Sequence, residues 1–182
     1  QGKVRPKESV EIWNLVFTQF DRQPDGSLKP LPRKSIDTGM GLERLTRVMQ
    51  GVETDYETDL FAPIIAAIRD LEKGKKAKPE RIVFAERAIA DHLRAIVFLI
   101  AEGLLPSNES RGYVLRMLIR RVIRLAQQIG GLEGKWTTAD RRPAFLGLLV
   151  DSVRGSMMGS PYYDSLMAKR DTIARVVEQE EA

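Results

Sequence analysis

A ten-residue stretch at positions 35–44, SIDTGMGLER, changes the pattern of this chain from strand to helix. β-Branched and aromatic residues dominate before it. After it, Leu42, Leu45, Val48 and Met49 recur at the spacing of one helix face. A chain with this changeover near its start and helical patterns over most of the rest is predicted to be α+β and mostly helical.

The same stretch is a candidate binding site. Gly39 and Gly41 have no Cβ, so a ligand could approach the main chain closely there. Asp37 stands near the predicted strand end and Arg44 in the first turns of the helix, which would suit a zwitterionic or phosphorylated ligand. The alternative is a tight strand-to-helix connection with an N-cap, and the glycine pair alone does not decide between the two.

An antiparallel hairpin is predicted to lead into this stretch. Residues 10–20 are rich in Val, Ile, Trp and Phe, which is typical of a strand with both faces largely covered. Residues 24–27 (PDGS) form a turn signal, and residues 28–36 return as a second strand. The hairpin would place Asn14 and Asp37 on paired strands, facing one cavity. Alternatively, nearby backbone groups satisfy the Asn14 amide.

A helical bundle is predicted to follow the hairpin. We expect helices over about 40–50, 60–73, 79–102, 111–129 and 143–153, with a last helix starting at Ser160-Pro161. The predicted domains are residues 1–58 and 59–182. The basic loop 74–78 is either a solvated turn or a phosphate contact. Both ends of the sequence suggest a piece of a longer protein.

The predicted helix 111–129 has one strongly basic face. At 100° per residue, its four inner arginines fall within about 140° of arc, and no acidic residue occurs from Arg111 to Leu132. These four are Arg116, Arg120, Arg121 and Arg124. Arginine forks suit phosphate oxygens, so the face predicts contact with nucleic acid. The alternative is pairing with acidic groups elsewhere.

The other side of that helix is apolar and is predicted to join the core. Its residues are Val114, Leu115, Leu118, Ile119, Val122, Leu125, Ala126 and Ile129.

The composition excludes several kinds of site. The 182 residues contain no cysteine, so disulfides and thiolate metal sites are excluded, and the single histidine, His92, argues against zinc. No metal ligand is predicted. The apolar runs are too short to cross a bilayer, and no signal-peptide pattern opens the chain. We therefore expect a soluble, cytoplasmic protein that does not bind membranes.

Several motifs, taken in order, resemble the alanyl-tRNA synthetases, a family of class II aminoacyl-tRNA synthetases. They are residues 11–17 (EIWNLVF), 30–32 (PLP), 37–44 (DTGMGLER), 90–94 (ADHLR) and 111–116 (RGYVLR). The likeness covers nearly the whole chain, and the glycine-rich stretch corresponds to motif 3. It implies that residues 1–58 end the aminoacylation domain and that residues 59–182 belong to the helical tRNA-recognition domain.

The resemblance also implies a function and a set of site residues. Alanine would be activated with ATP and Mg²⁺ and then transferred to tRNA(Ala). Asn14 and Asp37 would bind alanine, and Asn108 would lie at the acceptor stem, where the family reads a G·U pair. The ATP-binding residues implied are Ile12, Trp13, Asn14, Gly41 and Arg44. The remaining tRNA-binding residues implied are Arg111, Arg116, Arg120, Arg121 and Arg124.

The chain also departs from the family pattern. Motifs 1 and 2 would lie before Gln1, a second acceptor-stem determinant would lie beyond Ala182, and Met117 stands where the family usually has arginine. The rest of the synthetase is thus a predicted partner, and the chain alone is predicted not to make alanyl-adenylate. Two alternatives stay open, a non-catalytic tRNA- or RNA-binding module and a structural subunit whose arginines meet an acidic protein.

Overall fold

The computed structural model describes residues 9–71, 78–130 and 145–181, in two compact units, Gln1–Thr58 and Asp59–Ala182. The first unit contains a two-stranded antiparallel sheet and a helix, and the second is helical. The predicted α+β class is confirmed.

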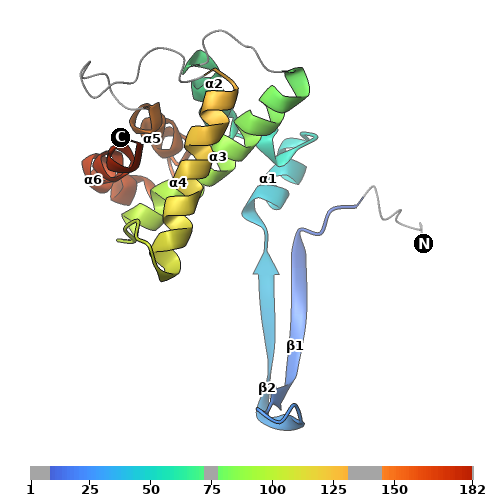
Figure 1. Ribbon diagram of the computed structural model, residues 1–182. Helices are drawn as coiled ribbons and strands as arrows, with labels where there is room; N and C mark the ends of the chain where they lie inside the picture. The colour runs from blue at the N-terminus through green and yellow to red at the C-terminus, as the bar shows by residue number, and fades with distance from the viewer. Residues whose placement is uncertain (1–8, 72–77, 131–144, 182) are drawn as a thin grey trace. The chain divides into compact units, whose positions relative to one another are not determined.

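The first unit is built on a long hairpin (Figure 1). Strand β1 spans Trp13–Arg22 and pairs with β2, Leu28–Met40. The predicted turn at 24–27 is present: Gly26 has a φ of 84°, and the Asp25 carboxylate accepts hydrogen bonds from the N–H and hydroxyl of Ser27. These bonds hold the pKa of Asp25 below its ordinary value.

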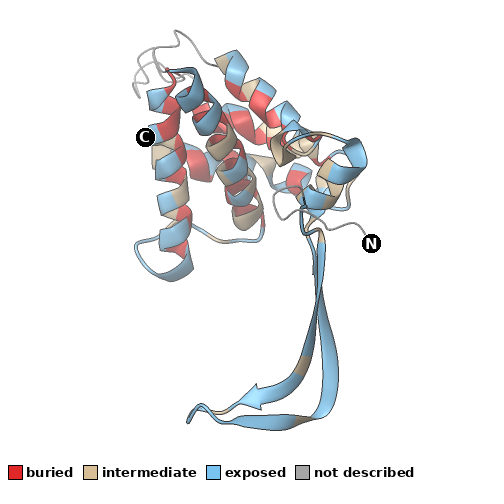
Figure 2. Ribbon diagram, turned by 90° about the vertical axis from the view of Figure 1, so that its right-hand side faces the viewer, coloured by how far each residue is buried: buried red, intermediate tan, exposed pale blue. Residues whose placement is uncertain are grey.

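The prediction that both faces of β1 are largely covered is wrong for the described part of the chain. Apolar side chains are exposed along both strands, with Trp13 60% and Phe17 and Ile36 62% accessible. Figure 2 shows the hairpin as exposed along almost its whole length. A two-stranded sheet can bury these side chains only against a further strand or layer, and the described residues provide none.

Helix α1 spans Leu42–Gln50 and ends at Gly51, whose φ of 66° is left-handed, as a C-terminal glycine commonly is. It begins two residues later than predicted because Met40 still pairs with Trp13 in the sheet. Gly41 is the extended residue between strand and helix. A 3₁₀ turn, η1, follows at Asp55–Glu57.

Neighbouring helices of the second unit pack against one another (Figure 1). Helix α3 lies against α4, and α5 lies against α6 and α2. The helices are α2 Ala62–Leu71, α3 Pro79–Ala101, α4 Ser110–Gln128, α5 Phe145–Ser156 and α6 Tyr163–Glu181. Pro79 at the start of α3 and Gly103 just past its end, with a φ of 89°, confirm the predicted bounds. Residues 74–77 of the basic loop and the predicted start of α5 at 143 lie outside the described residues.

One core joins these helices, and Figure 2 shows its buried residues on their inward sides. Fully buried side chains come from every helix of the unit, among them Ile64, Ile89, Leu93, Ile119, Leu149 and Ile173. Two predicted core positions of α4 differ: Val114 is 47% exposed and Leu118 is half-buried. Val114 lies at the margin of the apolar arc, next to the arginine face.

A buried ion pair joins α2 to α3. Glu86 is buried, and its carboxylate accepts hydrogen bonds from Arg69 Nε at 3.0 Å and Nη2 at 2.7 Å. Two parallel bonds of this kind fix the geometry of both side chains. The pair was not predicted from the sequence, because its members lie on different predicted helices.

Polar contacts also join α5 to α6. Glu181 accepts hydrogen bonds from the N–H groups of Phe145 and Leu146 at the start of α5, and burial raises the pKa of its carboxyl. Arg170 donates to both oxygens of Asp151, at 3.2 and 3.0 Å. The Arg170 guanidinium holds the pKa of Asp151 below its ordinary value, and the same contact raises the pKa of Arg170 itself. Among the described residues, no helix is both long and apolar enough to cross a membrane.

Candidate functional site

The hairpin register puts two predicted site residues on one face. Asn14 is opposite Gly39, and Val16 is opposite Asp37. Because opposite residues of an antiparallel pair project to the same side and side chains alternate along a strand, Asn14 and Asp37 are diagonal neighbours on that face. Gly39 leaves space between them, since a Cβ there would lie 3.6 Å from Asn14 Oδ1. Asn14 and Asp37 are both exposed.

Trp13 projects from the opposite face of the hairpin. Its indole Nε1 donates to the Thr38 hydroxyl, which in turn donates to the carbonyl oxygen of Asn14 at 3.0 Å. The side chain of Trp13 therefore does not share a face with Asn14 and Asp37. Ile12 is half-buried, and its carbonyl oxygen accepts from the N–H of Gly41 at 3.0 Å, which extends the strand pairing by one bond.

Glu11 connects the two ends of this site. Its carboxylate accepts from Asn14 Nδ2 at 3.0 Å, and its carbonyl oxygen accepts from Arg44 Nη1 at 2.9 Å. The Arg44 stem lies over Gly41, where a Cβ would be 3.3 Å from Arg44 Cδ. The missing side chain at Gly41 thus lets Arg44 fold back towards β1. Glu11 belongs to the motif at residues 11–17 but was not predicted as a site residue.

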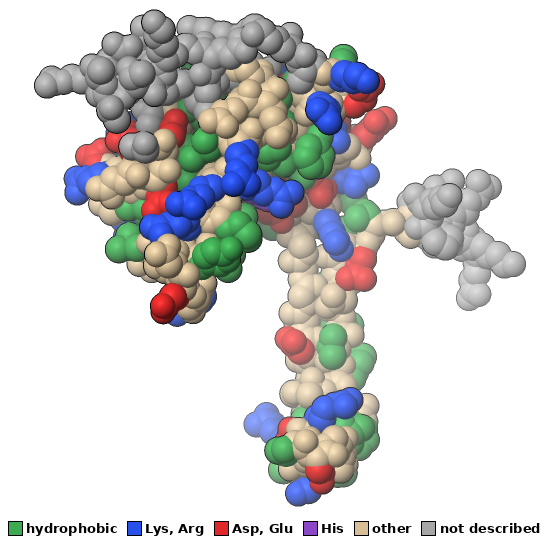
Figure 3. Space-filling view, in the orientation of Figure 1, with side chains coloured by type: hydrophobic (Ala, Val, Ile, Leu, Met, Phe, Trp, Pro, Cys, Tyr) green, Lys and Arg blue, Asp and Glu red, His purple; other side chains and the backbone are tan. Residues whose placement is uncertain are grey.

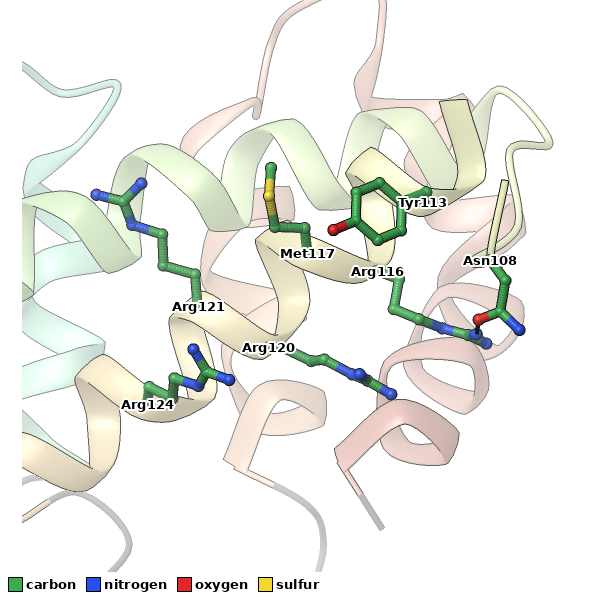
Figure 4. A pocket seen from close by; sticks show the side chains of 7 residues that line it. All are labelled: Asn108, Tyr113, Arg116, Met117, Arg120, Arg121 and Arg124. Carbon is green, nitrogen blue, oxygen red and sulfur yellow. Dashed lines mark hydrogen bonds between the residues drawn. The ribbon is translucent and has the colours of Figure 1, made fainter. Parts of the chain in front are cut away.

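A groove lies along the basic face of α4 (Figure 4). Its volume is about 440 Å³, and it combines four arginines with one amide, one phenol and one thioether. The lining residues are Asn108, Tyr113, Arg116, Met117, Arg120, Arg121 and Arg124. Those within α4 recur at intervals of three and four, so they form one helix face. In Figure 3 the arginines gather as a basic band on this face.

Three of the groove arginines have free guanidinium groups within the described part of the chain. Arg120, Arg121 and Arg124 are exposed, with no hydrogen bond or ion pair to any described residue. Arg111 is also exposed on α4 but does not line the groove. An unpaired positive surface of this kind attracts an anionic partner.

Arg116 differs from the other three. It forms an ion pair with Glu180 of α6 at 2.7 Å, and its Nη1 donates to the amide oxygen of Asn108. The expectation that no carboxylate neutralises this face is therefore wrong at one position. The acidic partner is 64 residues away in sequence, so the local pattern of α4 could not show it.

Asn108 lies just ahead of α4 but does not cap it. Glu109 is the N-cap residue, without a side-chain hydrogen bond, and Ser110 follows with a φ of 52°. A left-handed residue other than glycine costs about 1–2 kcal/mol. The chain therefore makes a sharp turn here, and the Asn108 side chain reaches Arg116 instead of the helix N–H groups.

Two groove residues were not predicted. Tyr113 and Met117 are 53% and 48% exposed and lie one turn apart beside the arginines. The sequence signal that could have indicated them is their spacing of four residues, which places both on the same helix face as the arginines.

No metal site is found among the described residues, which contain no group of three acidic, histidine or cysteine side chains placed to hold an ion. His92 Nδ1 lies 3.1 Å from Asp91 Oδ2. Arg94 places its guanidinium 4.4 Å from the centre of the Phe61 ring. Both side chains thus contact residues of the protein itself, and we assign neither to a binding site.

Comparison with known proteins gives one consistent result. The family described as tRNA synthetases class II (A) matches residues 2–182. The alanine–tRNA ligase of Geobacillus thermodenitrificans is 48% identical over 172 residues, 94% of this chain. The alanine–tRNA ligases of Magnetococcus marinus and Staphylococcus epidermidis are 49% and 45% identical, again over 94% of this chain.

The chain spans 18% of the length of these curated relatives. Because the family match extends over nearly every residue of the sequence, the chain belongs to the class II (A) family of tRNA synthetases.

Proposed function

We propose that this chain is part of an alanine–tRNA ligase, in which residues 1–58 form one side of the aminoacylation site and residues 59–182 bind the tRNA acceptor stem. The observation that carries the proposal is the shared face of Asn14 and Asp37. It occurs in a chain nearly half identical to proteins with the name alanine–tRNA ligase.

The proposed alanine site uses the chemistry of that face. Asp37 offers a carboxylate to the α-ammonium of alanine, and the Asn14 amide oxygen lies on the same side. A negative group and a neutral acceptor together favour an ammonium over a hydroxyl group. Glu11 fixes the Asn14 amide through its nitrogen, which leaves the oxygen available to the ligand.

The proposed ATP site adjoins it. Arg44 Nη1 donates to the carbonyl oxygen of Glu11, just ahead of β1. The other guanidinium nitrogens of Arg44 remain for phosphate or adenine. Ile12, Trp13, Asn14 and Gly41 complete the proposed site, with Trp13 acting through its backbone because its ring lies on the other face. The alanine carboxylate attacks the α-phosphate of ATP and pyrophosphate leaves, so these residues position and stabilise charge. Mg²⁺ would accompany ATP, and we assign no ligand for it among the described residues.

The proposed tRNA site is the α4 groove. Arg120, Arg121 and Arg124 would neutralise phosphates, with Arg111 beside the groove on the same helix. Asn108 and Arg116 would lie at the acceptor-stem end of the groove. Phosphate contacts of this kind position a nucleic acid without reading its sequence. A cytoplasmic location would accompany this function and stays a prediction.

The catalytic half of the proposal is tested with a chimera. This chain replaces the matching segment of the Geobacillus thermodenitrificans ligase, and alanine-dependent ATP–pyrophosphate exchange is measured. We expect activity, and we expect Asp37→Ala to raise the KM for alanine at least about tenfold, the loss of one charge-assisted bond. Asp21→Ala, a carboxylate lost elsewhere on the hairpin, is the matched control.

The RNA half is tested with the chain itself. We expect an acceptor-stem hairpin RNA to bind in a salt-dependent way, and the change of Arg120, Arg121 and Arg124 together to alanine to abolish binding. Arg175→Ala, an exposed arginine of α6 away from the groove, should have little effect. RNA binding by the chain together with an inactive chimera would favour the non-catalytic binding module. If the chain does not bind RNA and the chimera is inactive, the remaining alternative is the structural subunit.

A further inference from the structure

Each of the three guanidinium nitrogens of Arg116 donates to another group of the protein. Its Nε donates to both oxygens of Glu180, at 3.1 and 3.0 Å, and its Nη2 donates to Glu180 Oε1 at 2.7 Å. The remaining nitrogen, Nη1, donates to Asn108. The pair is also partly shielded, since the side chains of Arg116 and Glu180 are 23% and 13% exposed. Arg116 is therefore less available to a phosphate than Arg120, Arg121 and Arg124.

This arrangement fixes the orientation of the Asn108 amide. An arginine has only hydrogen-bond donors, so the amide atom facing it must be the oxygen, Oδ1. The NH₂ group of Asn108 then points the other way, as Figure 4 shows, and the residue is exposed at the end of the groove. Asn108 thus presents its NH₂ donor to solvent at the end of the groove.

The link between Asn108 and the core is a chain of charge-assisted bonds. Glu180 is anchored in α6, and its two oxygens hold the fork of Arg116 in one plane. Such bidentate pairs have defined geometry, so the amide at their end has less freedom to rotate than an exposed asparagine alone.

We propose that Glu180 and Arg116 are positioning residues, which turn Asn108 so that its NH₂ selects a hydrogen-bond acceptor on RNA in the α4 groove. The acceptor would be a base-edge or ribose oxygen or nitrogen of the shallow minor groove, the only side of an RNA helix that side chains can read. The inference rests on the proposed function of this groove and assigns Arg116 a role other than phosphate binding.

The first test needs no RNA. The side-chain amide signals of Asn108 are followed by ¹⁵N–¹H NMR in the chain and in its Glu180→Gln variant. We expect these signals to move in Glu180→Gln and in Arg116→Lys, which cannot serve Glu180 and Asn108 with the same geometry. They should stay in place in Arg120→Ala, the control on the same face. Unmoved signals in Glu180→Gln would overturn the inference and leave the proposed function standing.

The second test measures affinity for an acceptor-stem hairpin RNA. Asn108→Asp keeps the oxygen that faces Arg116 but replaces the donor by a second oxygen, so it should weaken binding more than Asn108→Ala. Binding by Asn108→Asp as tight as that of the unaltered chain would mean that the NH₂ donor is not used, and the inference would be wrong.

A double-mutant cycle separates positioning from charge. Glu180→Gln also frees the positive charge of Arg116, but this effect is the same in the unaltered chain and in the Asn108→Ala variant, so it cancels in the cycle. We expect the effect of Glu180→Gln on affinity to differ by at least about threefold between the two backgrounds. Equal effects in both would overturn the inference, whereas no RNA binding by the unaltered chain would overturn the proposed function as well. Thermal melting of each variant confirms that it is folded.

Discussion

At the scale of single residues, Gly112 is the position in α4 that accepts no side chain. It is buried, and a Cβ there would lie 2.7 Å from the carbonyl oxygen of Leu105 and closer still to the Ser107 hydroxyl. The loop that carries Asn108 therefore packs directly on the helix backbone, and the Ser107 N–H donates to the Gly112 carbonyl oxygen at 3.1 Å.

Gly112→Ala should lower the free energy of unfolding by about 1–3 kcal/mol, because the loop must move, and that cost exceeds the gain in helix propensity. Urea unfolding measures it. Gly155→Ala in α5, where a Cβ meets nothing within 4 Å, is the control and should be neutral or stabilising by up to about 1 kcal/mol. If both variants gained stability, the close packing at Gly112 would be wrong.

The buried carboxylate of Glu86 depends on Arg69 as its partner. Arg69→Ala leaves Glu86, whose side chain is 3% exposed, without its bidentate partner. Because Arg69 itself is 56% exposed, the loss should fall near the lower end for buried pairs, about 3 kcal/mol in the free energy of unfolding. Arg81→Ala, an exposed arginine of α3, should change it by less than about 0.5 kcal/mol. Similar values for the two variants would contradict the importance of the pair.

At the scale of elements, the α5–α6 contact predicts a pH dependence. The pKa of Asp151 is lowered by Arg170, so the unfolded chain takes up the proton more readily than the folded chain. The stability contributed by Asp151 is then complete above its ordinary pKa of 3.8 and is lost as the pH falls below that value. Both partners are about 40% exposed, so the contribution is below about 1 kcal/mol.

Urea midpoints at pH 7, 5 and 3 test this expectation. Asp151→Asn should lower the midpoint at pH 7 and 5 but bring it close to that of the unaltered chain at pH 3. Asp70→Asn, an exposed carboxylate of α2, is the control and should follow the unaltered chain at each pH. A constant difference between Asp151→Asn and the unaltered chain down to pH 3 would contradict the linkage.

The elements themselves were largely predictable from the sequence, because their signals are local. Periodicity marked the helices, and Gly51 and Gly103 marked two of their ends through left-handed backbone. The turn predicted that Asn14 and Asp37 lie on paired strands. Their placement on one face depends on a register shift between Thr18 and Phe20, which was not predicted.

The contacts between elements were not predictable. Two ion pairs join different helices: Arg69 pairs with Glu86, 17 residues away in sequence, and Arg116 pairs with Glu180, 64 residues away. Nothing in the local pattern of either helix marks its partner. The exposure of the hairpin was mispredicted for a related reason: apolar composition reports that a strand is suited to burial, not that a covering layer lies in the same chain.

At the scale of the whole molecule, the chain alone should not activate alanine. The proposed site has Asp37 and Asn14 on an exposed hairpin and Arg44 on α1, and no further strand pairs with the hairpin among the described residues. Alanine-dependent ATP–pyrophosphate exchange should therefore stay at background for the isolated chain, with the chimera described above as the positive control. Measurable exchange by the chain alone would refute this prediction.

The two units should also differ in local stability. An isolated two-stranded hairpin is marginal in water, whereas α3 and α4 contribute fully buried side chains to a common core. In hydrogen exchange, amides of β1 and β2 should therefore exchange at least about a hundredfold faster than amides in the middle of α3. Equal protection in the hairpin and in α3 would show that the hairpin is stabilised by something other than its own strands.

The ion pair between Arg116 and Glu180 affects how many counterions a bound nucleic acid would release on contact with the basic face. Each arginine that neutralises a phosphate adds about one to the slope of log affinity against log salt concentration. Replacing Arg120, Arg121 or Arg124 should each flatten that slope by about one, while replacing Arg116 should leave it unchanged. A helix that displays four arginines along its groove would then behave, towards a polyanion, as a helix with three.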